Sequence, residues 1–170
     1  IQGYDNGATL SCLSDVRSST DIVVVRRAAA CVAGSADCTA LAGAPMFQAS
    51  LCNSDTELGS STTTDQFRLD TDASHLDRHQ RDCATLAYTH QFLTHIYFVA
   101  NNDQAGDGVP TLKRAELAAG VFTIVPVAEG IENLQLEYGI DTDSDGAVNT
   151  YTADPDGFTS PRVPRPPSRL

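Results

Sequence analysis

The stretch of residues 91–100 constrains the fold more than any other part of this sequence. Read as an extended strand, it places Phe92, Ile96 and Phe98 on one face and Leu93 and Tyr97 on the other. Both faces are therefore apolar. A strand of this kind is typical of the centre of a sheet that is covered on both sides. We expect residues 91–100 to form such a central strand.

Shorter strands are expected elsewhere, because brief apolar or β-branched runs are separated by turn-forming residues. These runs are residues 22–25, 66–69, 109–112 and 121–125. Residues 101–108 are rich in Asn, Asp and Gly and predict a hairpin turn. The order of these segments favours a β-rich, antiparallel fold.

A further strand is expected at residues 134–140. Leu134, Leu136, Tyr138 and Ile140 alternate with polar residues or glycine, which indicates one buried and one exposed face. We expect this strand to join the same sheet as residues 91–100.

The cysteines indicate cross-links around a long irregular region at residues 32–65. There are five cysteines, no CxxC pair is present, and counting alone does not fix how they pair. The simplest choice joins Cys31 to Cys38 and Cys52 to Cys83, and it leaves Cys12 over. This usage favours an oxidising compartment over the cytosol.

Charge and hydropathy exclude several classes of partner. The chain has 22 acidic residues against 11 lysines and arginines, a net charge of −11. Proteins that bind nucleic acids or anionic membranes carry the opposite sign. The most apolar stretch, residues 117–128, is too short and too interrupted to span a bilayer. We expect no nucleic-acid partner and no membrane contact by this chain.

The clearest chemical motif is the sequence DTDSDGAVN at residues 141–149. Its first half matches the EF-hand calcium loop, in which carboxylates at positions 1, 3 and 5 precede a glycine at position 6. The predicted ligands are the residues at positions 1, 3, 5, 7 and 9: Asp141, Asp143, Asp145, Ala147 and Asn149. Position 12 is Thr152 rather than a bidentate glutamate, and Asp154 and Asp156 follow as candidate late carboxylates.

Two interpretations of this loop stay open. The first is a lone structural calcium site at the end of a strand. The second is an ordinary turn, because Asp, Ser and Gly form turns in any context.

No catalytic motif is present in the chain. His75 and His79 stand four residues apart, but the residues between them do not match the HExxH pattern of zinc proteases, and we interpret them as an unrelated pair. GxSxG, P-loop and GxGxxG motifs are absent. We expect no enzymatic activity and no cofactor other than calcium.

Three parts of the chain carry a family resemblance. They are STDIVVVRRA at residues 19–28, FLTHIYFVANN at 92–102 with GVPTLKR at 108–114, and VAEGIENLQLEYGID at 127–141 with DSDG at 143–146. In content, order and spacing these segments resemble the PilW family of type IV pilus minor pilins. The resemblance is patchy before residue 85 and close over residues 90–152.

The resemblance implies a fold, a location and partners. The fold would be a pilin-like α+β head, rich in β-structure, over residues 1–157. Its sheet would pack on a hydrophobic N-terminal helix that this chain does not contain. The full-length protein would be anchored in the inner membrane, face the periplasm and then enter the extracellular pilus fibre. Its partners would be other minor pilins, major pilins and a tip adhesin, and it would prime assembly at or near the pilus tip.

Residues 158–170 depart from the family and are rich in proline and arginine, which predicts a disordered tail. Because this ending differs and the chain starts without methionine, we expect a processed or truncated product. A secreted, calcium-stabilised binding or adhesion module outside any pilus is the alternative that the residues alone would allow.

Overall fold

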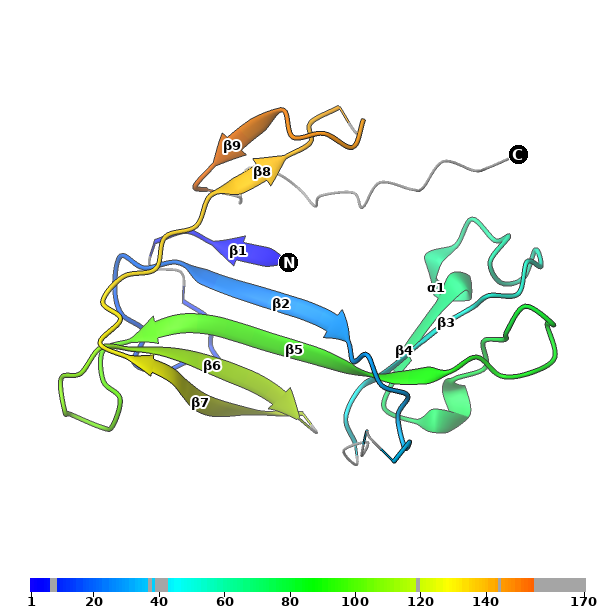
Figure 1. The fold of residues 1–170 in the computed structure, drawn as a ribbon, viewed down its shortest axis with the longest axis horizontal. Coiled ribbons are helices and arrows are strands. Elements are labelled where there is room, and N and C mark those ends of the chain that lie inside the picture. The colour runs from blue at the N-terminus through cyan, green and yellow to red at the C-terminus, as the bar shows by residue number, and fades with distance from the viewer. Residues whose placement is uncertain (7–8, 37, 39–42, 119, 144, 155–170) are drawn as a thin grey trace. The chain divides into compact units, whose positions relative to one another are not determined.

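The computed structural model describes residues 1–6, 9–36, 38, 43–118, 120–143 and 145–154. Within them the regular secondary structure is almost entirely β-strand (Figure 1). Its elements are β1 (Gln2–Tyr4), β2 (Ile22–Ala28), β3 (Met46–Ala49), α1 (Thr63–Gln66), β4 (Phe67–Asp70), η1 (Ala73–His75), β5 (Thr89–Ala100), β6 (Thr111–Ala118), β7 (Val121–Glu129), β8 (Tyr138–Ile140) and β9 (Thr150–Thr152). The prediction of a β-rich antiparallel fold is confirmed. Among the described residues no helix is long and apolar enough to cross a membrane.

The chain divides into two compact units, which we describe separately. The first unit comprises Ile1–Val24, Ile96–Ala115 and Ile124–Leu170, and the second comprises Val25–His95 and Glu116–Thr123. Strand pairing follows the order β1-β2-β5-β3-β4, with β6 paired to β5 and β7 paired to β6. Strand β5 therefore has neighbours on both edges, which confirms the prediction of a central strand at residues 91–100.

The core of the first unit is built by β2 and the second half of β5. Ile22 and Val24 are buried there, as are Ile96, Phe98 and Ala100 on one face of β5. The opposite face of β5 is covered only in part.

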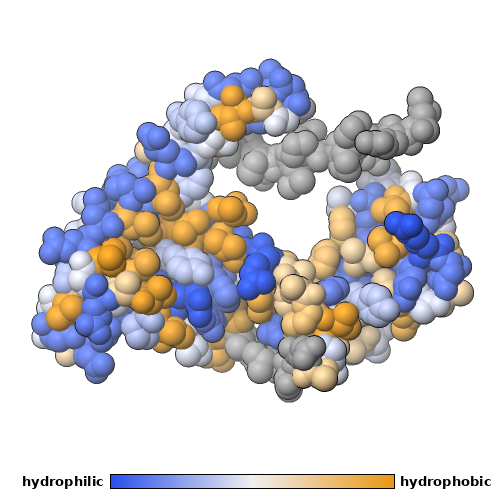
Figure 2. Space-filling view, viewed as in Figure 1, coloured by the Kyte–Doolittle hydropathy of each residue, from blue (hydrophilic) through white to orange (hydrophobic). Residues whose placement is uncertain are grey.

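Val99 on that face is fully buried, whereas Leu93 and Tyr97 are half-buried. The prediction that both faces of this strand are covered therefore holds for one face and only partly for the other. Figure 2 shows apolar surface gathered over β2.

Residues 134–140 differ from the prediction. Only Tyr138–Ile140 form a strand, β8, and it pairs with β9 in a separate two-stranded sheet. Residues 134–136 are held by Asp21 instead, because the Asp21 N–H donates to the Leu134 carbonyl at 2.9 Å and the Leu136 N–H donates to the Asp21 carboxylate at 2.7 Å. The backbone and the side chain of one residue, rather than a paired strand, are the hydrogen-bonding partners of residues 134 and 136.

Gly3 allows β1 and β8 to approach closely. A Cβ atom at Gly3 would lie 2.0 Å from the Tyr138 hydroxyl oxygen, so a larger residue at this position would force the Tyr138 ring to move. The Tyr138 hydroxyl is itself buried without a hydrogen-bond partner. Burial, then the charges of Asp21 and Asp5, raise the pKa of Tyr138.

The second unit contains more regular structure than the prediction of an irregular region at residues 32–65 allows. Residues 46–49 form β3, which pairs with β4 on one side and β5 on the other. Gln48 interrupts the apolar pattern of this strand, yet it is buried and both ends of its amide are bonded. Its Nε2 donates to the Ala87 carbonyl at 2.7 Å, and its Oε1 accepts the Arg78 N–H at 2.8 Å.

Both predicted disulfides are present in the second unit. Cys31 is joined to Cys38 and Cys52 to Cys83, while Cys12, in the first unit, is free and exposed. The predicted tail at residues 158–170 lies outside the described residues.

Candidate functional site: the acidic loop and the Glu57 network

The acidic loop, residues 141–149, connects β8 to β9 in the first unit. The two-stranded pairing brings its ends together, and the Asn149 N–H donates to the Ile140 carbonyl at 2.9 Å. Carboxylate oxygens of Asp141, Asp143 and Asp145 all lie within 4.8 Å of one another. The three carboxylates that the sequence singled out are therefore brought to one place.

Backbone hydrogen bonds shape the loop around these carboxylates. The Gly146 N–H donates to Asp141 Oδ2 at 2.9 Å, and the Ala147 N–H donates to Asp145 Oδ1 at 2.7 Å. Gly146 has a φ of 93°, a conformation that glycine adopts without a steric penalty.

Asn149 does not present its oxygen to the carboxylates. Its Oδ1 accepts the Thr142 N–H at 2.8 Å, and its Nδ2 donates to Asp143 Oδ2 at 3.3 Å. A backbone N–H only donates, so the oxygen must face Thr142. Among the predicted ligands, Asn149 therefore supports the loop in this arrangement, and Ala147 offers only its backbone carbonyl. Asp156 lies outside the described residues.

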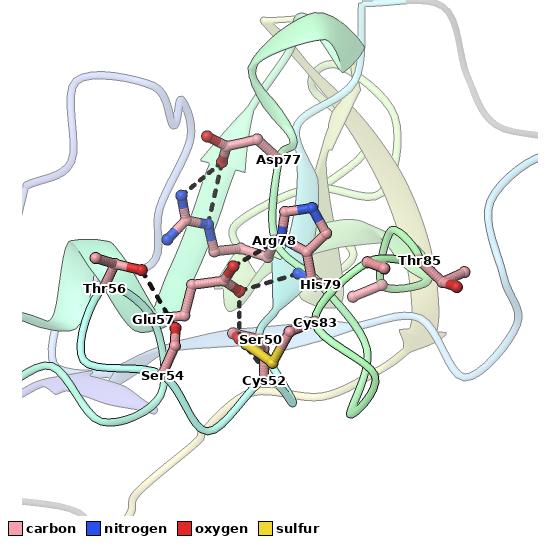
Figure 3. A network of polar contacts seen from close by, with 12 residues as sticks. Ser50, Cys52, Ser54, Thr56, Glu57, Asp77, Arg78, His79, Cys83 and Thr85 are labelled. Carbon is pink, nitrogen blue, oxygen red and sulfur yellow. Dashed lines mark hydrogen bonds and ion pairs between the residues drawn. A yellow bond between two sulfur atoms is a disulfide. The ribbon is translucent and has the colours of Figure 1, made fainter.

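A second cluster of polar side chains lies in the second unit, and we call it the Glu57 network: Ser50, Glu57 and His79 (Figure 3). Glu57 is 7% exposed. It accepts the Ser50 hydroxyl at 2.5 Å and the His79 N–H at 3.0 Å, and the His79 Nδ1 lies 2.6 Å from its other oxygen. The Cys52–Cys83 disulfide lies beside it, and the Cys52 N–H donates to the Ser50 hydroxyl at 3.1 Å.

The electrostatics of Glu57 are set by these bonds. Burial by itself would raise the pKa of the carboxyl group, but the hydrogen bonds from Ser50 and His79 outweigh it and lower the pKa to about 2. Glu57 is therefore ionised at any physiological pH.

The Glu57 network contains a serine, a histidine and an acid, but the hydroxyl is bonded to the wrong partner for acid–base activation. Ser50 donates to Glu57 rather than to His79. A nucleophilic serine requires its hydroxyl to donate to the base. The arrangement fits a structural role, in which Glu57 links the segments that contain Ser50 and His79 next to the Cys52–Cys83 disulfide.

The structure separates the two histidines that stand four residues apart in the sequence. His79 binds Glu57, whereas His75 Nδ1 lies 2.8 Å from Asp70 Oδ2, and the hydrogen bond with Asp70 raises the pKa of His75. The sequence interpretation of an unrelated pair is consistent with this. It missed the link from His79 to Glu57, since no spacing signal connects residues so far apart.

Comparison with known proteins finds one family. Residues 96–159 match the family of type IV pilus-assembly protein W. This segment is similar to PilW. It contains the end of β5, strands β6 to β9 and the acidic loop. Of the three parts of the chain that carry the resemblance, it includes the last and all of the second except residues 92–95. The match spans less than half of the chain and does not reach residues 19–28.

No curated protein and no solved structure matches the chain. The family match links residues 96–159 to type IV pilus assembly and thereby to the bacterial cell envelope. The same match indicates that residues 96–159 interact with other components of pilus assembly, without identifying them.

Proposed function

We propose that this chain is part of a minor pilin, a structural component that primes assembly at or near the tip of a type IV pilus. The observation that carries the proposal is the match of residues 96–159 to the PilW family. Its partners would be other minor pilins, the major pilin and a tip adhesin. Its role is structural rather than catalytic.

The chemistry of the chain supports an envelope location. Two disulfides favour an oxidising compartment such as the periplasm. We propose a pilin-like head that is held by a membrane anchor before assembly and is carried into the extracellular fibre afterwards.

The first prediction tests this role in the bacterium that encodes the chain. Deleting the gene is expected to remove most surface pili, as counted by electron microscopy, and expression of the full-length gene is expected to restore them. The protein is expected in sheared pili, detected by immunoblot, and is expected to be lost from that fraction when the major pilin gene is deleted. Release into the medium irrespective of the major pilin, with normal piliation, would instead indicate a secreted adhesion module.

We further propose that the acidic loop binds calcium in a structural role. The convergence of Asp141, Asp143 and Asp145 supports it, because close carboxylates repel one another unless a cation or water screens them. The loop lacks the bidentate glutamate of an EF-hand. Its affinity should therefore be that of extracellular modules, with a Kd on the order of 10⁻⁴ to 10⁻³ M.

The second prediction is a calcium-dependent gain in stability. At about 5 mM calcium such a site stabilises the folded chain by about 1–2 kcal/mol. The melting temperature should rise by about 2–8 °C relative to a sample with chelator. Asp143→Ala should abolish the calcium response, whereas Glu132→Ala, which removes an exposed acid outside the loop, should retain it. If calcium changes the melting temperatures of wild type and Asp143→Ala equally, the loop is an ordinary turn and not a calcium site.

A further inference from the structure

Strand β4 (Phe67–Asp70) in the second unit has an edge with no partner strand in the described part of the chain. It ends the strand order, and its only paired neighbour is β3. The Ser50 N–H donates to the Gln66 carbonyl at 2.9 Å, which makes Ser50 and Gln66 a hydrogen-bonded pair. Antiparallel pairs alternate, so Gln48 with Arg68 is the next hydrogen-bonded pair, and Phe67 and Leu69 direct their backbone groups away from β3.

The free edge offers specific backbone groups. The Phe67 N–H is already used, because it donates to the Thr63 carbonyl at the end of α1. The Phe67 carbonyl and both the N–H and the carbonyl of Leu69 remain on the outer side. Such a row of groups is a template for another strand.

The side chains of the same two residues are apolar and exposed. Phe67 is 43% exposed and Leu69 is 54% exposed. They lie on one face of the sheet with Phe47 of β3, whose ring stacks on Phe67 with centroids 5.6 Å apart. A hollow of about 360 Å³ runs along this edge, lined by Thr63, Thr64, Phe67, Arg68 and Leu69. The edge is therefore both apolar and accessible.

We propose that this edge pairs with the same edge of a second copy of the chain, in an antiparallel register centred on Leu69. In that register Leu69 faces Leu69 of the second copy as a hydrogen-bonded pair, which uses the outward N–H and carbonyl of both copies. The two leucine side chains then meet on the apolar face, next to Phe67. Phe67 faces Thr71 of the second copy.

Charge complementarity selects this register. With Leu69 opposite Leu69, Arg68 of each copy faces Asp70 of the other, on the face opposite the leucines. A shift by two residues along the strand would place Arg68 opposite itself or Asp70 opposite itself. Oppositely charged cross-strand pairs are favourable and like charges directly opposite are destabilising. Within one copy Arg68 also contacts Asp77, and Asp70 also contacts His75. The cross-strand pair would add to these contacts.

The pairing should be weak. The strand is short, and two copies that each carry a net charge of −11 repel one another at long range. We expect a concentration-dependent dimer whose population grows as added salt screens that repulsion.

A crosslinking experiment tests both the pairing and its register. The background is Cys12→Ser, which removes the free thiol. Leu69→Cys places two thiols opposite one another, where the Cα atoms of a hydrogen-bonded pair lie about 5.5 Å apart and within disulfide range. Phe67→Cys is the matched control, because its two copies would be separated by about 14 Å along the strands.

Under mild oxidation Leu69→Cys should form a covalent dimer many-fold faster than Phe67→Cys, and the parent chain should sediment as a concentration-dependent dimer. Arg68→Asp and Asp70→Arg should each abolish that dimer, while the double substitution should restore it. Circular dichroism would establish that each variant is folded. A parent chain that stays monomeric at millimolar concentration overturns the proposal. A strand of another protein would then be the candidate partner for this edge. Equal crosslinking of Leu69→Cys and Phe67→Cys overturns it too.

Discussion

Glu57 joins parts of the second unit that are distant in the sequence. Its carboxylate binds Ser50, which follows β3, and both the backbone and the ring of His79. A buried carboxylate is tolerated only when its lone pairs are satisfied, and here both oxygens are bonded. The charge therefore stabilises this part of the fold only while its partners are present.

The third prediction concerns Glu57→Gln. The amide keeps the shape but loses the charge and one acceptor, so we expect a loss of about 2–3 kcal/mol in the free energy of unfolding at pH 7. Urea denaturation measures it. Asp55→Asn is the matched control, since it makes the same change at an exposed position two residues away. If Glu57→Gln and Asp55→Asn lose the same unfolding free energy within experimental error, the role of Glu57 is contradicted.

The pH dependence of stability, in wild type and in Glu57→Gln, follows from the direction in which folding shifts the pKa of Glu57. The pKa of Glu57 is lowered from 4.5 to about 2 on folding, so the unfolded chain binds the proton more readily. The stabilisation by the charge is complete above pH 4.5 and is lost as the pH falls toward 2. The stability gap between wild type and Glu57→Gln should narrow over that range.

At the scale of elements, the segment before β8 is held by Asp21 and, through Gln135 Nε2, by the Ser19 carbonyl at 3.0 Å. Asp21 is 1% exposed, and its carboxylate accepts both the Leu136 N–H and, at 3.1 Å, the Asn6 N–H. It thereby ties the start of β2 to the loop after β1 and to the segment that leads into β8 and the acidic loop. This segment is not paired as a strand. We therefore expect its protection against hydrogen exchange to depend on local contacts, such as those with Asp21.

The fourth prediction is therefore that Asp21→Asn increases hydrogen exchange at residues 134–140 more than at residues 46–49 of the second unit. The amide has one acceptor oxygen where the carboxylate has two, so one of the two N–H groups loses its partner. Mass spectrometry of peptides from both segments measures the exchange. Asp5→Asn, a change of the same kind in the neighbouring loop, should leave both segments unchanged. A uniform increase across the two segments would indicate global destabilisation instead.

At the scale of the whole molecule, the features divide between the two units. The second unit carries both disulfides, the Glu57 network and the β4 edge. Most of the PilW match, with the acidic loop, falls in the first unit. Self-pairing through β4 and a role of residues 96–159 in pilus assembly would therefore use different units of the chain.

Features that depend on neighbouring residues were predictable from the amino-acid pattern. The doubly apolar residues 91–100 lie in β5, which has neighbours on both edges, because the centre of a sheet is the position that a strand with two apolar faces favours. The alternating carboxylates at 141, 143 and 145 converge because residues at that spacing in a tight loop point to one side. Both disulfides also agree with the simplest pairing.

The tertiary structure alone decided which distant groups meet. The Leu136 N–H is bonded to Asp21, 115 residues away, and so residues 134–136 leave the strand that their alternation predicts. Gln48 is buried in β3 only because the Ala87 carbonyl and the Arg78 N–H, 39 and 30 residues away, satisfy its amide. Periodicity records which side of a segment is apolar, whereas a polar group is buried where folding supplies its partner, and that partner leaves no mark in the neighbouring sequence.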